Sequence, residues 1–226
     1  MLHSQTIFED RIDAGQQLAR ALEETPHGDT VVLALPRGGI VPAAEVAQEL
    51  EAPLGVILVR KIGHPYDPEY AVGALVDDQE PMYNTAEIGN IADIWLRQAE
   101  EGARKTNALR RALYYGNGLR PPDIQGKTVI LVDDGIATGL SMEAAIHATR
   151  DAGAERIVVA VPIASRESIE QLKPIADSIV TLIDPDKFRG AVGGHYERFE
   201  EVTDQEVKAL LWEVNHDIST PLTAPS

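Results

Sequence analysis

Cysteine is absent from the 226-residue sequence, which excludes disulfide bonds, thiol nucleophiles and thiolate metal ligands. Long apolar runs are absent too, because no stretch approaches the roughly 18 residues that cross a membrane as a helix. Residues 1–10 lack the cationic start and the apolar run of a secretory signal. These absences predict a soluble cytoplasmic protein.

Positive charge is scarce as well. The chain has 20 lysine and arginine residues against 36 aspartate and glutamate residues, which gives a formal net charge of −16. Phosphate backbones and anionic membrane surfaces attract basic patches, so this balance argues against nucleic acid or a membrane as a partner. An anionic small molecule would have to be held by a local cluster of cations.

The most informative stretch is residues 129–141, which read VILVDDGIATGLS. Its four branched apolar residues fit a strand that is buried on both faces, and a helical pattern begins at Met142. The loop between them combines glycines, the hydroxyls of Thr138 and Ser141, and the N–H groups of a helix start, which together suit a phosphate group. The candidate phosphate-binding residues are Gly135, Ile136, Ala137, Thr138, Gly139, Leu140 and Ser141.

Two acids, Asp133 and Asp134, directly follow this strand. Carboxylates repel phosphate, so their expected targets are hydroxyl groups or a hydrated cation. A ligand with a phosphate on one side and vicinal hydroxyls on the other satisfies both halves, which points to a ribose 5-phosphate. The alternatives are a buried strand that ends in two solvated acids, a response-regulator receiver and a Walker B strand. A receiver carries its acids near the chain start, and the chain contains no G-x-x-x-x-G-K-[ST].

The four apolar residues followed by Asp-Asp-Gly-x-x-Thr-Gly resemble the binding motif of the type I phosphoribosyltransferases, which use 5-phosphoribosyl 1-pyrophosphate. The resemblance covers roughly residues 28–184. It is strong at 129–139 and supportive at 36–39 and 60–61. Within the family, the chain is most similar to uncharacterised phosphoribosyltransferase-domain proteins.

Apolar strands alternate with helical patterns along the chain, which is typical of an α/β fold with a parallel sheet and right-handed crossovers. The resemblance implies a doubly wound, mostly parallel sheet with a small hood built from the chain ends. The expected strands lie at 30–35, 53–59, 71–76, 82–84, 129–132, 156–161 and 178–183, and the expected helices at 5–24, 40–50, 86–114, 142–152, 165–176 and 200–215. We expect a single domain over 1–218, with its core at about 28–184, its hood from about 1–27 and 185–218, and a disordered tail at 219–226.

A second strand-loop-helix carries the tetrapeptide Pro36-Arg37-Gly38-Gly39 in its loop. Arg37 and the adjacent N–H groups of Gly38 and Gly39 could face an anion, although such a tetrapeptide alone is most often a tight turn. The resemblance implies that this loop holds the pyrophosphate.

Cations also follow the next expected strand, which runs into Arg60 and Lys61. A lysine at a strand end is usually a solvated terminator, but ligands of doubly wound sheets bind at the carboxyl ends of strands. The resemblance implies that Lys61, with Arg60, reaches the pyrophosphate. The long expected helix carries further cations that form either a solvated basic face or an arm closing over the pyrophosphate: Arg97, Arg104, Lys105, Arg110 and Arg111.

The resemblance implies an enzyme that displaces pyrophosphate from C1 by a nitrogenous base or a related nucleophile, with Asp133, Asp134 and Lys61 as catalytic residues. Mg²⁺ is implied as an ion carried chiefly by substrate oxygens and water, because it dehydrates reluctantly. Phe188 and Tyr196 either stack on the acceptor or pack the tail. The expected partners are small molecules, and a homodimer is also considered. The alternatives are a non-catalytic sensor of phosphoribosyl pyrophosphate or a nucleotide, and a phosphoribosyl pyrophosphate synthetase, which would need two tandem domains.

Overall fold

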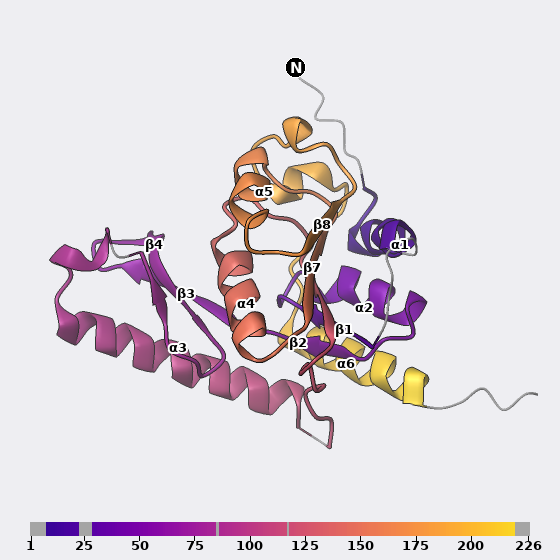
Figure 1. The fold of residues 1–226 in the computed structure, drawn as a ribbon, viewed down its shortest axis with the longest axis horizontal. Coiled ribbons are helices and arrows are strands. Elements are labelled where there is room, and N and C mark those ends of the chain that lie inside the picture. The colour runs from indigo at the N-terminus through magenta and orange to yellow at the C-terminus, as the bar shows by residue number, and fades with distance from the viewer. Residues whose placement is uncertain (1–7, 23–28, 85, 117, 220–226) are drawn as a thin grey trace, which may run out of the picture.

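The computed structural model describes residues 8–22, 29–84, 86–116 and 118–219. Its central sheet contains β1 (Thr30–Ala34), β2 (Leu54–Val56), β6 (Thr128–Val132), β7 (Arg156–Val161) and β8 (Ser178–Thr181). These five strands are parallel and lie in the order β2-β1-β6-β7-β8 (Figure 1). In the register of β1 with β6, Leu33 lies opposite Leu131. The carboxyl ends of β1 and β6 therefore lie next to each other.

Helices cover both faces of this sheet because its strands are apolar on both sides. Val32 and Ala34 pack toward one face, and Val31 and Leu33 toward the other. The first face is covered by α1 (Arg11–Leu22), α2 (Ile40–Glu49) and α6 (Asp204–Ser219), and the second by α4 (Leu140–Asp151) and α5 (Arg166–Leu172). The expected doubly wound α/β fold is confirmed.

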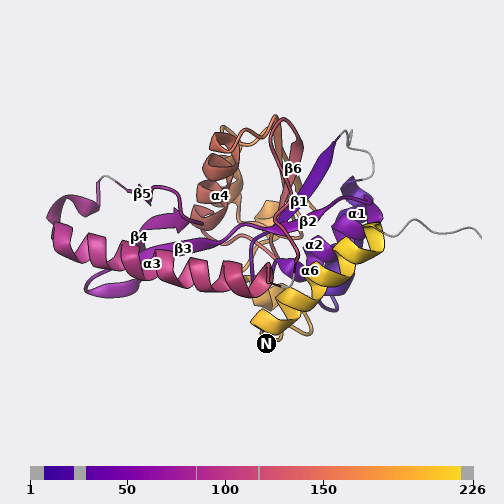
Figure 2. The same ribbon diagram turned by 90° about the horizontal axis from the view of Figure 1, so that it is seen from below.

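Residues 59–114 form an arm that extends from one side of the core (Figures 1 and 2). Ile62, Val72 and Leu75 form a small apolar core in it, against which Trp95 packs. The arm consists of an antiparallel sheet in the order β3-β4-β5 and a long helix: β3 (Val59–His64), β4 (Asp67–Val76), β5 (Met82–Tyr83), a 3₁₀ turn η1 (Ile88–Asn90) and α3 (Asp93–Tyr114).

The arm corrects one expectation from the sequence. A single strand was expected over 53–59, with Lys61 at its end, but β2 ends at Val56 and a new antiparallel strand begins at Val59. Ile57 and Leu58 between them are buried, so the apolar run continues where the strand pairing stops. Lys61 therefore lies within β3 of the arm.

The segment at residues 8–9 and the segment 195–198, which we call the chain ends, pair with each other. The N–H of Phe8 donates to the His195 carbonyl at 3.1 Å, and the N–H of Glu197 donates to the Phe8 carbonyl at 2.9 Å. The rings of Phe8 and Tyr196 lie 5.3 Å apart. The tail includes two 3₁₀ turns, η2 (Pro185–Lys187) and η3 (Val192–His195). The assignment of these ends to a hood stays a prediction, and its parts at 1–7 and 23–27 lie outside the described residues. Of the tail expected to be disordered at 219–226, Ser219 ends α6 and residues 220–226 lie outside the described part of the chain.

Several helix boundaries differ from expectation for identifiable reasons. The helix α6 begins after Thr203 rather than at 200 because Thr203 and Glu206 form a reciprocal cap: the Glu206 N–H donates to the Thr203 hydroxyl at 3.2 Å, and the Thr203 N–H donates to the Glu206 carboxylate at 2.7 Å. The long helix begins at Asp93 because η1 precedes it. In the described part of the chain, no helix is both long and apolar enough to cross a membrane.

Candidate functional site

The loop between β6 and α4 lines a cavity of about 240 Å³, which we call the glycine-loop cavity. Lys61 reaches it from the arm, and Asp133 reaches it from the end of β6. Val192 of η3 closes another side. The lining residues are Lys61, Asp133, Gly135, Ile136, Ala137, Thr138, Gly139, Ser141, Met142 and Val192. The structure thus brings Lys61 to the loop that the sequence singled out.

The start of this loop is held by hydrogen bonds to the segment that follows β7, residues 163–168. The N–H of Ile136 donates to the Ile163 carbonyl at 2.9 Å, and the N–H of Ser165 donates to the Ile136 carbonyl at 2.9 Å. The hydroxyls of Ser165 and Ser168 both donate to the Ala137 carbonyl, at 2.8 and 3.0 Å. Ile136 is buried. It therefore fixes the loop, while the rest of the loop stays open to the cavity.

Gly139 shapes the start of α4. Its φ of +78° lies in the left-handed region, and it is the N-cap residue of the helix. The first N–H groups of a helix have no partner within the helix and carry partial positive charge, so this end of α4 suits an anion. Thr138 and Ser141 add hydroxyl donors to the same wall. Leu140 is the exception among the predicted loop residues, because it lines a different cavity next to β4.

Asp133 lines the glycine-loop cavity, and its surroundings disfavour its charged form. Its Oδ1 accepts the N–H of Asp134 at 2.8 Å. Burial, followed by the charge of Asp134, raises the pKa of Asp133 well above its usual value. A carboxylate in this state gains from hydrogen-bond donors, so ribose hydroxyls suit it.

Asp134 points to a different set of partners. Its Oδ2 lies 2.7 Å from Nε of Arg11, and both side chains are largely buried. The Nη1 of Arg11 also donates to the Glu200 carbonyl at 2.7 Å, and its guanidinium lies 3.7 Å from the ring centre of Phe199. The hydroxyl of Tyr196 donates to the Asp134 carbonyl at 2.6 Å. Burial raises the pKa of Asp134, and the Arg11 cation opposes that rise.

A second cavity of about 460 Å³ lies on this side of the acid pair, and we call it the arginine cavity. It is lined by Arg11, Arg37, Gly38, Asp134, Phe199, Glu200, Glu201 and Val202. Arg37 forms an ion pair with Glu201 at its rim. The structure therefore separates two predicted cations, because Arg37 lines the arginine cavity and Lys61 lines the glycine-loop cavity.

The glycines after Arg37 are explained by packing. A Cβ on Gly38 would overlap the Asp134 carboxylate, and one on Gly39 would lie 2.8 Å from the Asp133 Cα. The N–H of Gly39 donates to the Leu35 carbonyl at 3.2 Å, so it faces the turn rather than a ligand. This corrects the expectation that the Gly39 N–H meets an anion. Both glycines are needed for the loop to approach the end of β6.

Other predicted contacts lie elsewhere in the fold. Arg104 pairs with Glu80, Arg110 with Asp204 at 3.5 Å, and Arg111 with Asp77 at 3.1 Å, so these cations hold the arm and α6 in place. The two aromatic candidates pack against other parts of the tail: the ring centres of Phe188 and His195 lie 5.5 Å apart, and Tyr196 is buried. In the described parts of the chain, neither the glycine-loop cavity nor the arginine cavity is lined by any of the predicted cations of α3, by Arg60, or by the two aromatic candidates.

Sequence reasoning missed Arg11. It lies 123 residues before Asp134, outside every motif, so no spacing signal marks it. Phe199 was not singled out from the sequence either. Both residues enter the site because the chain ends pair over the sheet.

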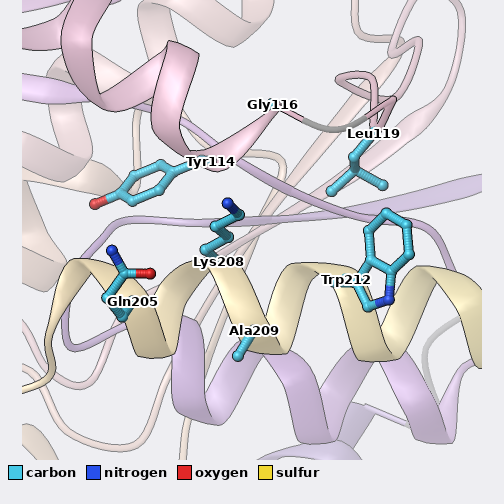
Figure 3. A pocket seen from close by; sticks show the side chains of 7 residues that line it. All are labelled: Tyr114, Gly116, Leu119, Gln205, Lys208, Ala209 and Trp212. Atoms are coloured by element: carbon cyan, nitrogen blue, oxygen red, sulfur yellow. The ribbon is translucent and has the colours of Figure 1, made fainter.

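A third cavity of about 360 Å³ lies away from the acids, between α6 and the segment after α3 (Figure 3). Figure 3 shows Lys208 between Tyr114 and Trp212, with Leu119 above the indole. None of its lining residues belongs to the glycine-loop or arginine cavity. It is therefore not part of the candidate site.

A parallel sheet covered by helices on both faces, with a glycine loop and paired acids at the end of a central strand, is typical of doubly wound α/β proteins that bind their ligands at the carboxyl ends of the strands. Comparisons narrow the class. A family model described as the phosphoribosyl transferase domain matches residues 4–198. The chain belongs to that family.

Individual relatives agree with this assignment. A Mycobacterium tuberculosis protein (strain ATCC 25618 / H37Rv) named "Putative phosphoribosyl transferase Rv0571c" is 39% identical over 214 residues, which are 94% of this chain and 48% of that protein. Adenine phosphoribosyltransferase of Marinobacter nauticus is 33% identical over 70% of this chain and 69% of its own length. The crystal structure of the Thermus thermophilus protein TT1426 has 42% identity and a TM-score of 0.79, covering 92% of this chain and 98% of that one.

The chain and its Mycobacterium tuberculosis relative differ in length. It spans about half of the Mycobacterium tuberculosis protein that it matches.

Proposed function

We propose that this chain transfers the phosphoribosyl group of phosphoribosyl pyrophosphate to a nitrogenous base or a related nucleophile, with release of pyrophosphate. The family and the relative named adenine phosphoribosyltransferase support phosphoribosyl transfer as the general reaction. The donor, the class of acceptor and the residue roles are our proposal, and so is the activity of the whole protein.

The arrangement of the two cavities carries this proposal. Asp133 lines the glycine-loop cavity and its chain neighbour Asp134 lines the arginine cavity, so the acid pair adjoins both. An elongated ligand with a phosphate at one end, hydroxyls in the middle and a pyrophosphate at the other end matches that order. The 5-phosphate would meet the α4 start and Lys61, and the pyrophosphate would meet Arg37.

The expected chemistry follows from the charges. Departure of pyrophosphate leaves an electron-poor, oxocarbenium-like C1, so catalysis comes mainly from stabilising the leaving group and holding the ribose in place. Arg37 would stabilise the departing pyrophosphate once its ion pair with Glu201 has opened. Asp133 would accept hydrogen bonds from the ribose hydroxyls, and Lys61 would neutralise charge at the 5-phosphate.

Magnesium fits this site as part of the substrate rather than as a resident ion. In the described ranges, no three histidine, aspartate or glutamate side chains converge into a group that could hold a metal. Asp134 is already paired with Arg11. Mg²⁺ keeps several water ligands and binds phosphate oxygens readily, so the pyrophosphate group would bring the ion with it.

The proposal is tested by mixing the protein with the magnesium salt of phosphoribosyl pyrophosphate and a panel of purines, pyrimidines and their precursors. We expect pyrophosphate release that depends on one class of acceptor. Calorimetric binding of phosphoribosyl pyrophosphate without release for any acceptor would make the chain a sensor. Absence of both binding and release would contradict both functions.

A further inference from the structure

The two neighbouring acids of the site have different neighbours. Asp133 lines the glycine-loop cavity, whereas Asp134 lines the arginine cavity, where Arg11 contacts its carboxylate at 2.7 Å. The Asp134 side chain is 14% exposed and the Arg11 side chain 11%. Little of the Asp134 carboxylate therefore remains for a ligand.

Three contacts hold Arg11 at this place. Its Nε meets Asp134, its Nη1 meets the Glu200 carbonyl at 2.7 Å, and its planar group lies over the Phe199 ring at 3.7 Å. Gly38 leaves room for the carboxylate, because a Cβ there would overlap it. Three segments thus meet around the Asp134 carboxylate: α1 contributes Arg11, the loop after β1 contributes Gly38, and the tail contributes the two groups that hold Arg11.

We propose that Arg11 is a positioning residue, which binds Asp134 so that Asp133 alone meets the ribose hydroxyls. This inference rests on the proposed function. Two adjacent buried carboxylates repel each other, and an arginine on one of them offsets part of that repulsion. Asp133 can then hold its orientation toward the glycine-loop cavity.

The division of labour gives different expectations for the two acids. Asp133→Asn removes a charged acceptor of the ligand, so ribose 5-phosphate should bind about tenfold or more weakly. Asp134→Asn keeps an oxygen that can accept from Arg11, so the loss should be several times smaller than for Asp133→Asn. Inorganic phosphate should bind both variants as it binds the unmodified protein, because the loop is anchored at Ile163 and Ser165.

Arg11 itself is tested with three variants. Arg11→Met leaves the Asp134 carboxylate without its cation, so the affinity for ribose 5-phosphate should fall by about tenfold or more while that for inorganic phosphate is unchanged. Arg11→Lys restores the charge and should recover part of the loss. Arg198→Met is the matched control, since Arg198 joins the same chain ends through Glu9 and Asp10 at 2.8 and 2.6 Å without contacting Asp134. It should leave both ligands unaffected.

Calorimetric titration of ribose 5-phosphate and inorganic phosphate, with thermal unfolding as a check of the fold, decides the matter. The inference is overturned if Arg11→Met binds ribose 5-phosphate normally, if Arg198→Met reproduces its loss, or if Asp134→Asn loses as much affinity as Asp133→Asn. If Arg11→Met does not fold, Arg11→Lys and the two aspartate variants give the answer. A failure of the proposed function looks different, because the unmodified protein would then bind ribose 5-phosphate no better than phosphate.

Discussion

The glycine-loop cavity and the arginine cavity adjoin the same pair of acids but are built in different ways. The first rests on backbone: a left-handed glycine, a helix start and the Ala137 carbonyl, which the hydroxyls of Ser165 and Ser168 hold. The second rests on side chains from distant segments, above all Arg11 and Arg37. A backbone wall holds its shape, whereas side chains can exchange partners when a ligand enters and departs.

The largest effect is expected from distorting the backbone wall of the glycine-loop cavity. Gly139→Val places a branched side chain at φ +78° with its Cβ 3.3–3.4 Å from Gln171 and Ser168, so the start of α4 must shift. We expect ribose 5-phosphate to lose at least about a hundredfold in affinity, as for the loss of several charge-assisted hydrogen bonds. Calorimetry measures it. Gly126→Val is the matched control, because Gly126 has φ +69° and open space around it. Normal binding by Gly139→Val would remove the phosphate from this loop.

Substitutions of the two cations, Lys61 in the glycine-loop cavity and Arg37 in the arginine cavity, should affect different ligands. A partly desolvated charge-assisted contact contributes about 1.5–3 kcal/mol, so each loss should cost roughly tenfold to a hundredfold in affinity. We expect Lys61→Met to weaken ribose 5-phosphate and phosphoribosyl pyrophosphate alike, and Arg37→Met to weaken only the latter to this extent. Arg60→Met, an exposed neighbour on β3, is the control. Equal losses of both ligands in Arg37→Met would place the pyrophosphate elsewhere.

The ionised carboxylate of Asp133 should lower the free energy of unfolding at neutral pH. Because the pKa of Asp133 is raised in the folded state, folding favours its protonated form, and stability falls as pH rises from below the unfolded pKa, about 3.9, through the folded pKa. We expect Asp133→Asn to unfold at a higher temperature than the unmodified protein at pH 7, with the difference shrinking as pH falls toward about 4. Thermal unfolding across this range checks the sign. A lower unfolding temperature at neutral pH would mean that the carboxylate stabilises the fold.

The smallest effect concerns the rim of the arginine cavity. Glu201 is 77% exposed on its side chain and pairs with Arg37. Exposed pairs contribute about 0–1 kcal/mol, so Glu201→Gln should tighten phosphoribosyl pyrophosphate by at most about fivefold and leave ribose 5-phosphate unchanged. Glu197→Gln, also exposed in the tail, is a suitable control. Weaker binding in Glu201→Gln would show that this carboxylate helps to form the site.

The same contrast explains what the sequence could predict. The strand, loop and helix over residues 129–141 are local, and four apolar residues followed by glycines at short spacing mark them. The break between β2 and β3 left no such mark, because buried Ile57 and Leu58 continue the apolar run. Arg11 was not predictable, since its role depends on a contact across 123 residues that only the pairing of the chain ends creates.

The central claim is that one ligand spans both cavities, and a crystal structure of the protein with ribose 5-phosphate and pyrophosphate tests it most directly. The account predicts the 5-phosphate at the start of α4 beside Lys61, a ribose hydroxyl on Asp133, the Arg11–Asp134 pair intact, and pyrophosphate at Arg37 with Glu201 displaced. A 5-phosphate bound at Arg37, or ribose hydroxyls on Asp134 with Arg11 moved away, would contradict it.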